Sequence, residues 1–150
     1  MPQPPLEALA YTSSAQGSFS EADLEALLAR ARERNRELGV TGALLYHDGC
    51  FFQYFEGPPA SVAAVYERIR LSPLHRGLIE LMRAPAWRRT FSDWQMGFTH
   101  VPASTLLQLS QASWLAQLGS EEGGPLESEG MSLLRQFWDS NRASGHGGGA

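Results

Sequence analysis

The stretch VTGALLYHDGCFFQYFEG, residues 40–57, decides the fold. Its centre, Asp48-Gly49, is a strong hairpin sequence, because both residues tolerate the positive φ that a two-residue turn requires. The apolar runs on either side therefore predict two antiparallel strands, over residues 40–47 and 50–56. Successive side chains of a strand face opposite ways. Both sides of the second strand are apolar, so we expect both faces of the sheet to be covered.

Other predicted elements surround this hairpin along the chain. Ser20 opens a helix, with Asp23 three residues on forming an imperfect capping box, and Gly39 ends it. The remaining elements predicted from apolar periodicity and turn residues are strands over 6–13, 77–83 and 93–98 and a helix over 60–71. The order βαββαββ predicts an α+β, ferredoxin-like sheet with both helices on one face. The first and third strands are then central and close to each other.

The chain beyond about residue 100 has a different pattern, which predicts a division into three parts. Residues 1–100 form the sheet domain, and residues 101–142 contain two segments with helical apolar spacing. Residues 143–150, ASGHGGGA, are expected to be a mobile tail. We expect the two helical segments to cover the sheet face that the early helices leave open. The candidates for this packing are Trp114, Leu118, Leu133, Leu134 and Trp138.

Composition and charge exclude several classes of protein. The 150 residues carry a net charge of −4. The arginines at 30–36 are interleaved with Glu33 and Glu37, which is typical of a solvated helix face and not of a nucleic-acid surface. The single cysteine, Cys50, excludes an internal disulfide and a cysteine-cluster metal site, and we expect it to be a small core residue. No apolar run suffices for a membrane span and no signal peptide is recognisable, so we expect a cytoplasmic protein.

Three polar side chains fall where the sequence predicts a core. Asn35 is the only polar residue in the inward series of the first helix, which runs through positions 24, 28, 31, 35 and 38. Gln53 lies in the middle of a central strand, and Tyr11 lies in the first strand. Each would cost about 1–3 kcal/mol if it were buried unpaired. They either satisfy one another and the backbone, or bind a ligand whose neutral edge alternates C=O and N–H groups, such as an isoalloxazine or a pyrimidine.

The other candidate residues are weaker. Glu56 and Asp93 lie at the ends of predicted strands, where we expect them to be solvated. Trp94 and Met96 share one face of the last predicted strand, and core packing explains them equally well. The histidines are scattered without the spacing of metal ligands, and the sequence contains no nucleophile–base pair and no glycine-rich phosphate loop.

These residues resemble a known family, the BLUF domain, a blue-light sensor that uses flavin. The resemblance covers about residues 6–98. It is carried by the Tyr11 strand and by the segments ARERNRELGVTGALLYHDGCFFQYFEGP, VYERI, SPLH and RRTFSDWQMGF. Its specific part is the run N-x-x-x-G-[IV]-T-G-x-L-x-Y followed by F-x-Q-x-x-E-G, with W-x-M at the proper spacing downstream.

The resemblance implies FAD bound non-covalently between the two early helices. By position, Tyr11 matches the photochemical tyrosine of the family, Gln53 its switching glutamine, and Asn35 the asparagine that binds the carbonyl edge of the flavin. Arg34 matches a basic residue beside the flavin, and Ile69 matches an apolar residue that packs on its ring. His75 matches the histidine that closes the D-x-R-H segment of the family. Trp94 and Met96 match the two residues that relay the signal.

One segment departs from the family pattern. Here Ser72 and Leu74 stand where the family has an acid and an arginine, just before His75. This departure puts the contacts to the ribityl and phosphate part of the cofactor in doubt, so FMN or riboflavin could be tolerated as well as FAD.

The resemblance also implies what the protein does. Light drives an electron and then a proton from Tyr11, and the hydrogen bonds of Gln53 rearrange to give a red-shifted state that is passed to a partner protein without substrate turnover. We expect a homo-oligomer with no direct contact to nucleic acid or membrane. Two alternatives stay open: a flavin-free ferredoxin-like interaction module, and an acylphosphatase-like enzyme, although the linker after the first strand lacks the arginine such an enzyme needs.

Overall fold

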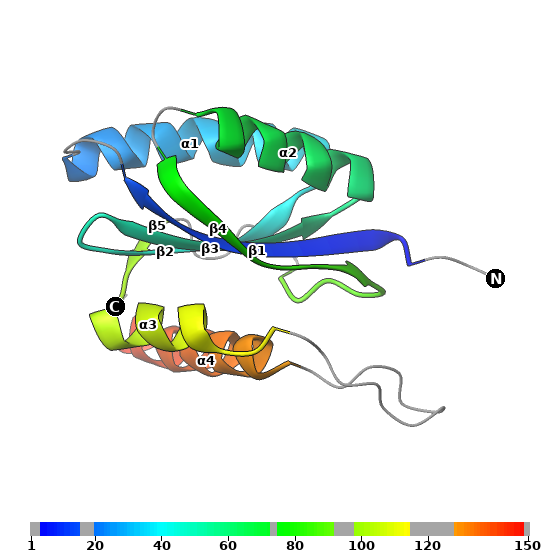
Figure 1. The fold of residues 1–150 in the computed structure, drawn as a ribbon. Helices are drawn as coiled ribbons and strands as arrows, with labels where there is room; N and C mark the ends of the chain where they lie inside the picture. The colour runs from blue at the N-terminus through cyan, green and yellow to red at the C-terminus, as the bar shows by residue number, and fades with distance from the viewer. Residues whose placement is uncertain (1–3, 16–19, 73–74, 92–97, 115–127, 149–150) are drawn as a thin grey trace, which may run out of the picture. The chain divides into compact units, whose positions relative to one another are not determined.

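The predicted hairpin forms the centre of the structure (Figure 1), a computed structural model that describes residues 4–15, 20–72, 75–91, 98–114 and 128–148. Strand β2 (Thr41–His47) pairs antiparallel with β3 (Cys50–Gly57). The turn residues Asp48 and Gly49 have φ values of 43° and 82°, the left-handed geometry that closes a two-residue hairpin. Cys50 is exposed, so the prediction of a core cysteine is wrong. Cys50 is the first residue after the turn, and burial of the strand begins only at the next residue, Phe51.

Five strands form one sheet in the order β4-β1-β3-β2-β5. Its further strands are β1 (Leu6–Ala15), β4 (His75–Ala86) and β5 (Phe98–His100). Strand β1 pairs antiparallel with both β3 and β4, while β5 runs parallel to β2. The ferredoxin-like order, with the first and third strands adjacent, is therefore confirmed. The last strand was predicted over 93–98 but is observed over 98–100, and residues 93–97 lie outside the described part of the chain.

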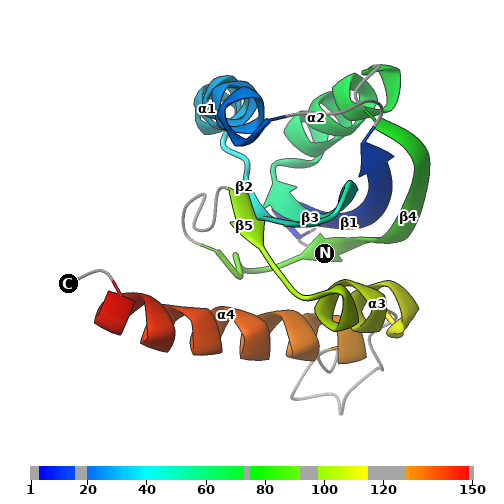
Figure 2. The same cartoon turned by 90° about the vertical axis from the view of Figure 1, so that its left-hand side faces the viewer.

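Two helices, α1 (Glu21–Leu38) and α2 (Pro59–Leu71), cover one face of this sheet, as Figure 2 shows. The predicted capping box is present, because Ser20 Oγ accepts from the backbone N–H of Asp23 at 3.1 Å and Asp23 Oδ2 accepts from that of Ser20 at 3.3 Å. Gly39 ends α1 with a φ of 75°. Between the helices and the sheet lies an apolar cluster: Leu9, Tyr11, Val40, Phe55, Val62, Val65 and Tyr66.

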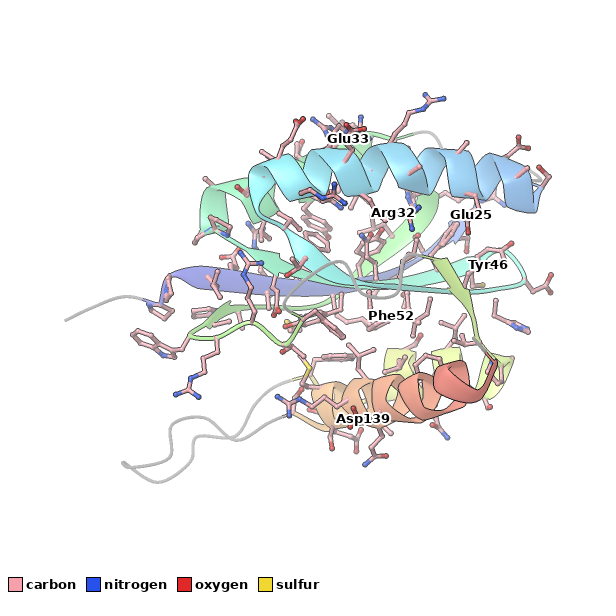
Figure 3. The ribbon with its side chains drawn as sticks, turned by 180° about the vertical axis from the view of Figure 1, so that it is seen from behind. Glu25, Arg32, Glu33, Tyr46, Phe52 and Asp139 are labelled. Carbon is pink, nitrogen blue, oxygen red and sulfur yellow. The ribbon has the colours of Figure 1, made fainter. Side chains whose placement is uncertain are left out.

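The charged run on α1 is solvated, as predicted. Arg30, Glu33, Arg34, Arg36 and Glu37 are exposed. Figure 3 shows Glu33 on the outer side of α1 and Phe52 on the sheet face away from that helix. Both faces of β3 are buried from Phe51 to Gly57, which agrees with the apolar pattern on both sides of this strand.

The chain divides into two compact units, Met1–Leu106 and Leu107–Ala150, and the division falls within α3 (Ala103–Gln111). In the second unit, α4 (Glu129–Gly148) is joined to the chain after α3 by two hydrogen bonds. The N–H of Gly130 donates to the carbonyl of Ser113 at 2.9 Å, and Ser113 N–H donates to Glu129 Oε1 at 3.1 Å. The Trp114 indole packs on Gly130, where an added Cβ would lie 2.2 Å from Trp114 Cε2.

Helix α4 continues to Gly148, so the backbone of residues 143–148 is helical where a tail was predicted from the glycine content. Extending a formed helix adds a hydrogen bond without a new nucleation step, which allows residues of low helix propensity to continue it. Of the predicted packing residues, Trp114 and Leu134 are buried and Leu133 is half-buried. Leu118 and the side chain of Trp138 lie outside the described part of the chain. The three-part division and the covering of the open sheet face stay predictions. No helix in the described ranges is long and apolar enough to span a membrane.

Candidate functional site

Two of the predicted site residues meet directly at the centre of the sheet. The register of β1 and β3 places Tyr11 opposite Gln53, and the Tyr11 hydroxyl donates a hydrogen bond to Gln53 Oε1. Tyr11 is fully buried, and Gln53 is 7% exposed. The pair therefore lies in an environment where its hydrogen bond does not compete with water.

Burial determines the protonation state of Tyr11. Loss of solvent raises the pKa of its phenol far above the ordinary value, and the neighbouring Tyr66, whose ring centroid lies 6.3 Å from that of Tyr11, raises it further. The phenol is therefore neutral at physiological pH and acts as a hydrogen-bond donor. Gln53, which has both a donor and an acceptor end, is oriented with its oxygen toward that donor.

Two buried amide groups lack a partner within the part of the chain that the structure describes. One is Gln53 Nε2, and the other is the side-chain carboxamide of Asn35, a residue 5% exposed on the inner side of α1. Leaving each group unpaired would cost about 1–3 kcal/mol, and such groups normally mark a bound ligand or water. Internal pairing, one of the two explanations that the sequence left open, thus accounts for the Tyr11 hydroxyl but not for these amides.

An aromatic and apolar wall surrounds the Tyr11–Gln53 pair. The His75 ring lies edge-on to Tyr11 with centroids 6.0 Å apart at 83°, and its Nδ1 lies 2.7 Å from Ser13 Oγ. Burial lowers the pKa of His75, which favours the neutral imidazole. Ile69 of α2 packs against the cluster that contains Tyr11. The described residues that line this side of the Tyr11–Gln53 pair are therefore aromatic, aliphatic or neutral imidazole groups.

The structure does not bring every predicted residue into this site. Arg34 is exposed on α1, next to Asn35 in sequence. Trp94 and Met96 lie outside the described residues, as does Leu74. Ser72 caps the end of α2, donating its backbone N–H to the carbonyl of Ile69 at 3.1 Å.

Two residues near the site, and one buried carboxylate on the opposite face of the sheet, were not predicted from the sequence. Ser13 orients His75, and its position two residues after Tyr11 on β1 already placed it on the same strand face. Tyr66 lies on the inward face of α2. Its aromatic ring fits the apolar pattern of that face, so the sequence did not single out its hydroxyl as a site group. Glu56 was expected to be solvated but is completely buried, because β3 continues past it to Gly57 and the chain at Phe91 binds its carboxylate.

This donor set fits a flavin. Gln53 Nε2 and the Asn35 carboxamide, which lack partners within the described residues, match an edge of alternating C=O and N–H groups, and an apolar wall matches an aromatic ring system. Within the described residues no charged side chain is hydrogen-bonded to Tyr11 or Gln53, which favours a neutral recognised edge over a bare phosphate.

Comparison with known proteins agrees with this chemistry. The family model described as "BLUF: Sensors of blue-light using FAD" matches residues 6–97. The photoactivated adenylate cyclase subunit beta of Euglena longa is 36% identical over 92 residues, 61% of this chain and 11% of that protein. The blue light- and temperature-regulated antirepressor BluF of Escherichia coli K12 is 35% identical over 85 residues, 55% of this chain and 21% of that protein.

A solved structure of a BLUF protein is also similar to this chain. The dark-state structure of BlrB, a BLUF protein, has a TM-score of 0.61 at 31% identity, covering 65% of this chain and 74% of that one. This chain spans about a tenth and a fifth of the two curated relatives named above, according to their 11% and 21% coverage.

Proposed function

The chain belongs to the BLUF family, the sensors of blue light that use FAD, and on this premise we propose that it is a blue-light photoreceptor. The proposed cofactor is FAD, held without a covalent bond between the sheet and the helices α1 and α2. The proposed signal is a change in the hydrogen bonds of Gln53. The observation that carries this proposal is the buried Tyr11–Gln53 hydrogen bond, with the opposite end of the same amide unpaired within the described residues.

The residues that would hold the flavin are those of the site described above. The carboxamides of Asn35 and Gln53 would bind its carbonyl and imide edge, Ile69 would pack on the ring, and His75 would border it. Arg34, exposed beside Asn35, is available to the outer part of the cofactor. Because Ser72 and Leu74 replace an acid and an arginine, we propose that FMN and riboflavin are bound as well as FAD.

The chemistry of the switch follows from the chain's own groups. A bound flavin, when excited, supplies a strong oxidant. Tyr11 would donate an electron to that oxidant. Because burial keeps its phenol protonated, its proton would move along the hydrogen bond toward Gln53 Oε1 together with or after the electron. Gln53 connects the phenol to the cofactor side. Turning its amide, or moving a proton on it, exchanges the donor and acceptor ends and changes which neighbour receives a hydrogen bond.

The experiment is an absorption measurement on the purified full chain. We expect a yellow protein whose flavin band shifts reversibly to the red in blue light. Gln53→Leu, with similar volume, should keep the fold and the flavin but lose the long-lived shift. Tyr11→Phe should retain flavin and lose the normal photoproduct. Gln108→Leu, at an exposed glutamine of α3, is the matched control. A wild-type shift in flavin-loaded Gln53→Leu protein would place the switch elsewhere.

The two alternatives from the sequence differ from the photoreceptor proposal in their expected absorption. A flavin-free interaction module and an acylphosphatase-like enzyme would both be colourless and unresponsive to light. We propose that this chain turns over no substrate itself, since its family consists of sensors.

We propose that the output passes to a separate protein partner, with the second unit as the segment that carries it. The matched relatives include a photoactivated adenylate cyclase subunit and an antirepressor, in which this region is a small part of a longer chain. Truncation after Pro102 keeps the hydrogen bonds of Val101 to β2. The truncated protein should therefore keep its red shift while losing light-dependent partner binding. Cytoplasmic location and homo-oligomer formation are further parts of this proposal.

A further inference from the structure

Glu56 is a buried carboxylate that the photochemical site does not use. It lies on β3 three residues after Gln53 and is fully buried. Because side chains alternate along a strand, it projects to the face opposite Gln53. Glu56 Oε2 accepts a hydrogen bond from the Tyr54 hydroxyl at 2.7 Å, and Oε1 accepts one from the backbone N–H of Phe91 at 2.8 Å. Burying a carboxylate is costly unless such donors compensate it.

Phe91 is held on three sides by this arrangement. Its N–H binds Glu56, its carbonyl accepts from Thr41 Oγ1 at 2.7 Å, and its ring packs on Tyr54 with centroids 5.7 Å apart. Phe91 is only 2% exposed. The chain at this position is therefore fixed to β3 and β2 through both of its backbone polar groups.

Arg89 extends the same cluster to the end of α1. Its guanidinium donates to Thr41 Oγ1 at 2.8 Å and to the carbonyl of Gly39 at 2.7 Å. Gly39 follows α1 four residues after Asn35, and its N–H donates to the Asn35 carbonyl. We call Thr41, Tyr54, Glu56, Arg89 and Phe91 the Glu56 cluster. It joins the strand of Gln53, the helix of Asn35 and the chain before residues 92–97.

We propose that Glu56 is a positioning residue through which the hydrogen-bond change at Gln53 is passed to the chain at Phe91. The inference rests on the proposed photoreceptor function. Gln53 and Glu56 are about 10 Å apart along one strand at ~3.3 Å per residue, and Tyr54, which binds Glu56, follows Gln53 directly. A displacement of β3 at Gln53 would therefore reach the carboxylate within a single strand. In sequence, the residues after Phe91 include Trp94 and Met96, the positions matched to signal relay.

The test separates local photochemistry from coupling. Red-shift amplitude reports the state of the site, and hydrogen exchange of the Phe91 amide, measured in the dark and under continuous blue light, reports the state of the cluster. Glu56→Gln keeps an acceptor oxygen but removes the charge. Thr41→Val keeps the shape of the side chain and removes the hydroxyl that binds Phe91 and Arg89. This second variant keeps the experiment informative if Glu56→Gln fails to fold. Thr105→Val, at a half-buried threonine of α3 outside the cluster, is the matched control.

We expect light to change the exchange rate of the Phe91 amide in the wild type and in Thr105→Val. In Glu56→Gln and Thr41→Val we expect normal flavin content and red shift, but a loss of that light-minus-dark difference. Dark exchange at Phe91 should be faster in Glu56→Gln by about threefold to tenfold, the effect of weakening one charge-assisted hydrogen bond.

The contrary outcomes are distinct. A wild-type light-minus-dark difference in both cluster variants would overturn the coupling role and leave Glu56 purely structural, even if dark exchange were faster. A wild type that shifts normally but shows no light effect at Phe91 would overturn it too. A wild type with no red shift would refute the proposed photoreceptor function itself, together with the inference that rests on it.

Discussion

The hydrogen bond between Tyr11 and Gln53 can be tested by a double-mutant cycle. Tyr11→Phe leaves the buried Gln53 oxygen without its donor, which should lower the free energy of unfolding by about 2 kcal/mol. Gln53→Leu leaves the Tyr11 hydroxyl unpaired, but it also removes the buried Nε2 group, so its cost should be smaller, about 1 kcal/mol. The double variant replaces both partners by apolar groups and should cost about 1 kcal/mol or less, because no polar group is left unpaired.

These values imply a coupling energy of about 2 kcal/mol between the two positions. The measurement is urea unfolding followed by circular dichroism, on flavin-free protein in the dark, so that ligand binding does not add to stability. Tyr46→Phe combined with Gln53→Leu is the control pair and should be additive. If the Tyr11 and Gln53 effects add within about 0.5 kcal/mol, the two side chains do not interact and the geometry of the switch is wrong.

Three further predictions concern other parts of the chain. Asn35→Ala should weaken flavin affinity by roughly twofold to tenfold for each hydrogen bond lost, measured by flavin titration; unchanged affinity would make Asn35 a structural residue. In Gly130→Ala the new Cβ would lie 2.2 Å from the Trp114 indole. The second unit should lose about 1–2 kcal/mol despite the better helix propensity of alanine, seen as a lower urea midpoint of the helical signal; a raised midpoint would contradict this packing. Burial raises the pKa of Glu56 above its ordinary value of 4.5, so the folded state holds this proton more tightly than the unfolded one. Stability from this group is present at low pH and is lost as pH rises from 4.5 through the raised pKa. Glu56→Gln should remove that part of the slope of unfolding free energy against pH, and an identical pH profile would disprove the assignment.

Local sequence patterns determined most of the fold. The Asp48-Gly49 turn, the cap at Ser20 and the stop at Gly39 depend on the conformational preferences of a few neighbouring residues, and all three are found as predicted. The order of strands and helices then restricts the topology to few choices, since crossovers are right-handed. The pairing of Tyr11 with Gln53 could be anticipated, because strand order and side-chain alternation place both on the central strands and on the helix side.

Only the tertiary structure decided which polar groups are buried and what they bind. Glu56 and Cys50 stand at opposite ends of the same strand, and the sequence assigned each to the wrong environment. Burial at a strand end depends on segments distant in sequence, here the chain at Phe91, thirty-five residues beyond Glu56. The same holds for the contact of Ser13 with His75 across sixty-two residues. Local propensity acts over a few residues, whereas the environment of a side chain is set by whichever distant segments fold against it.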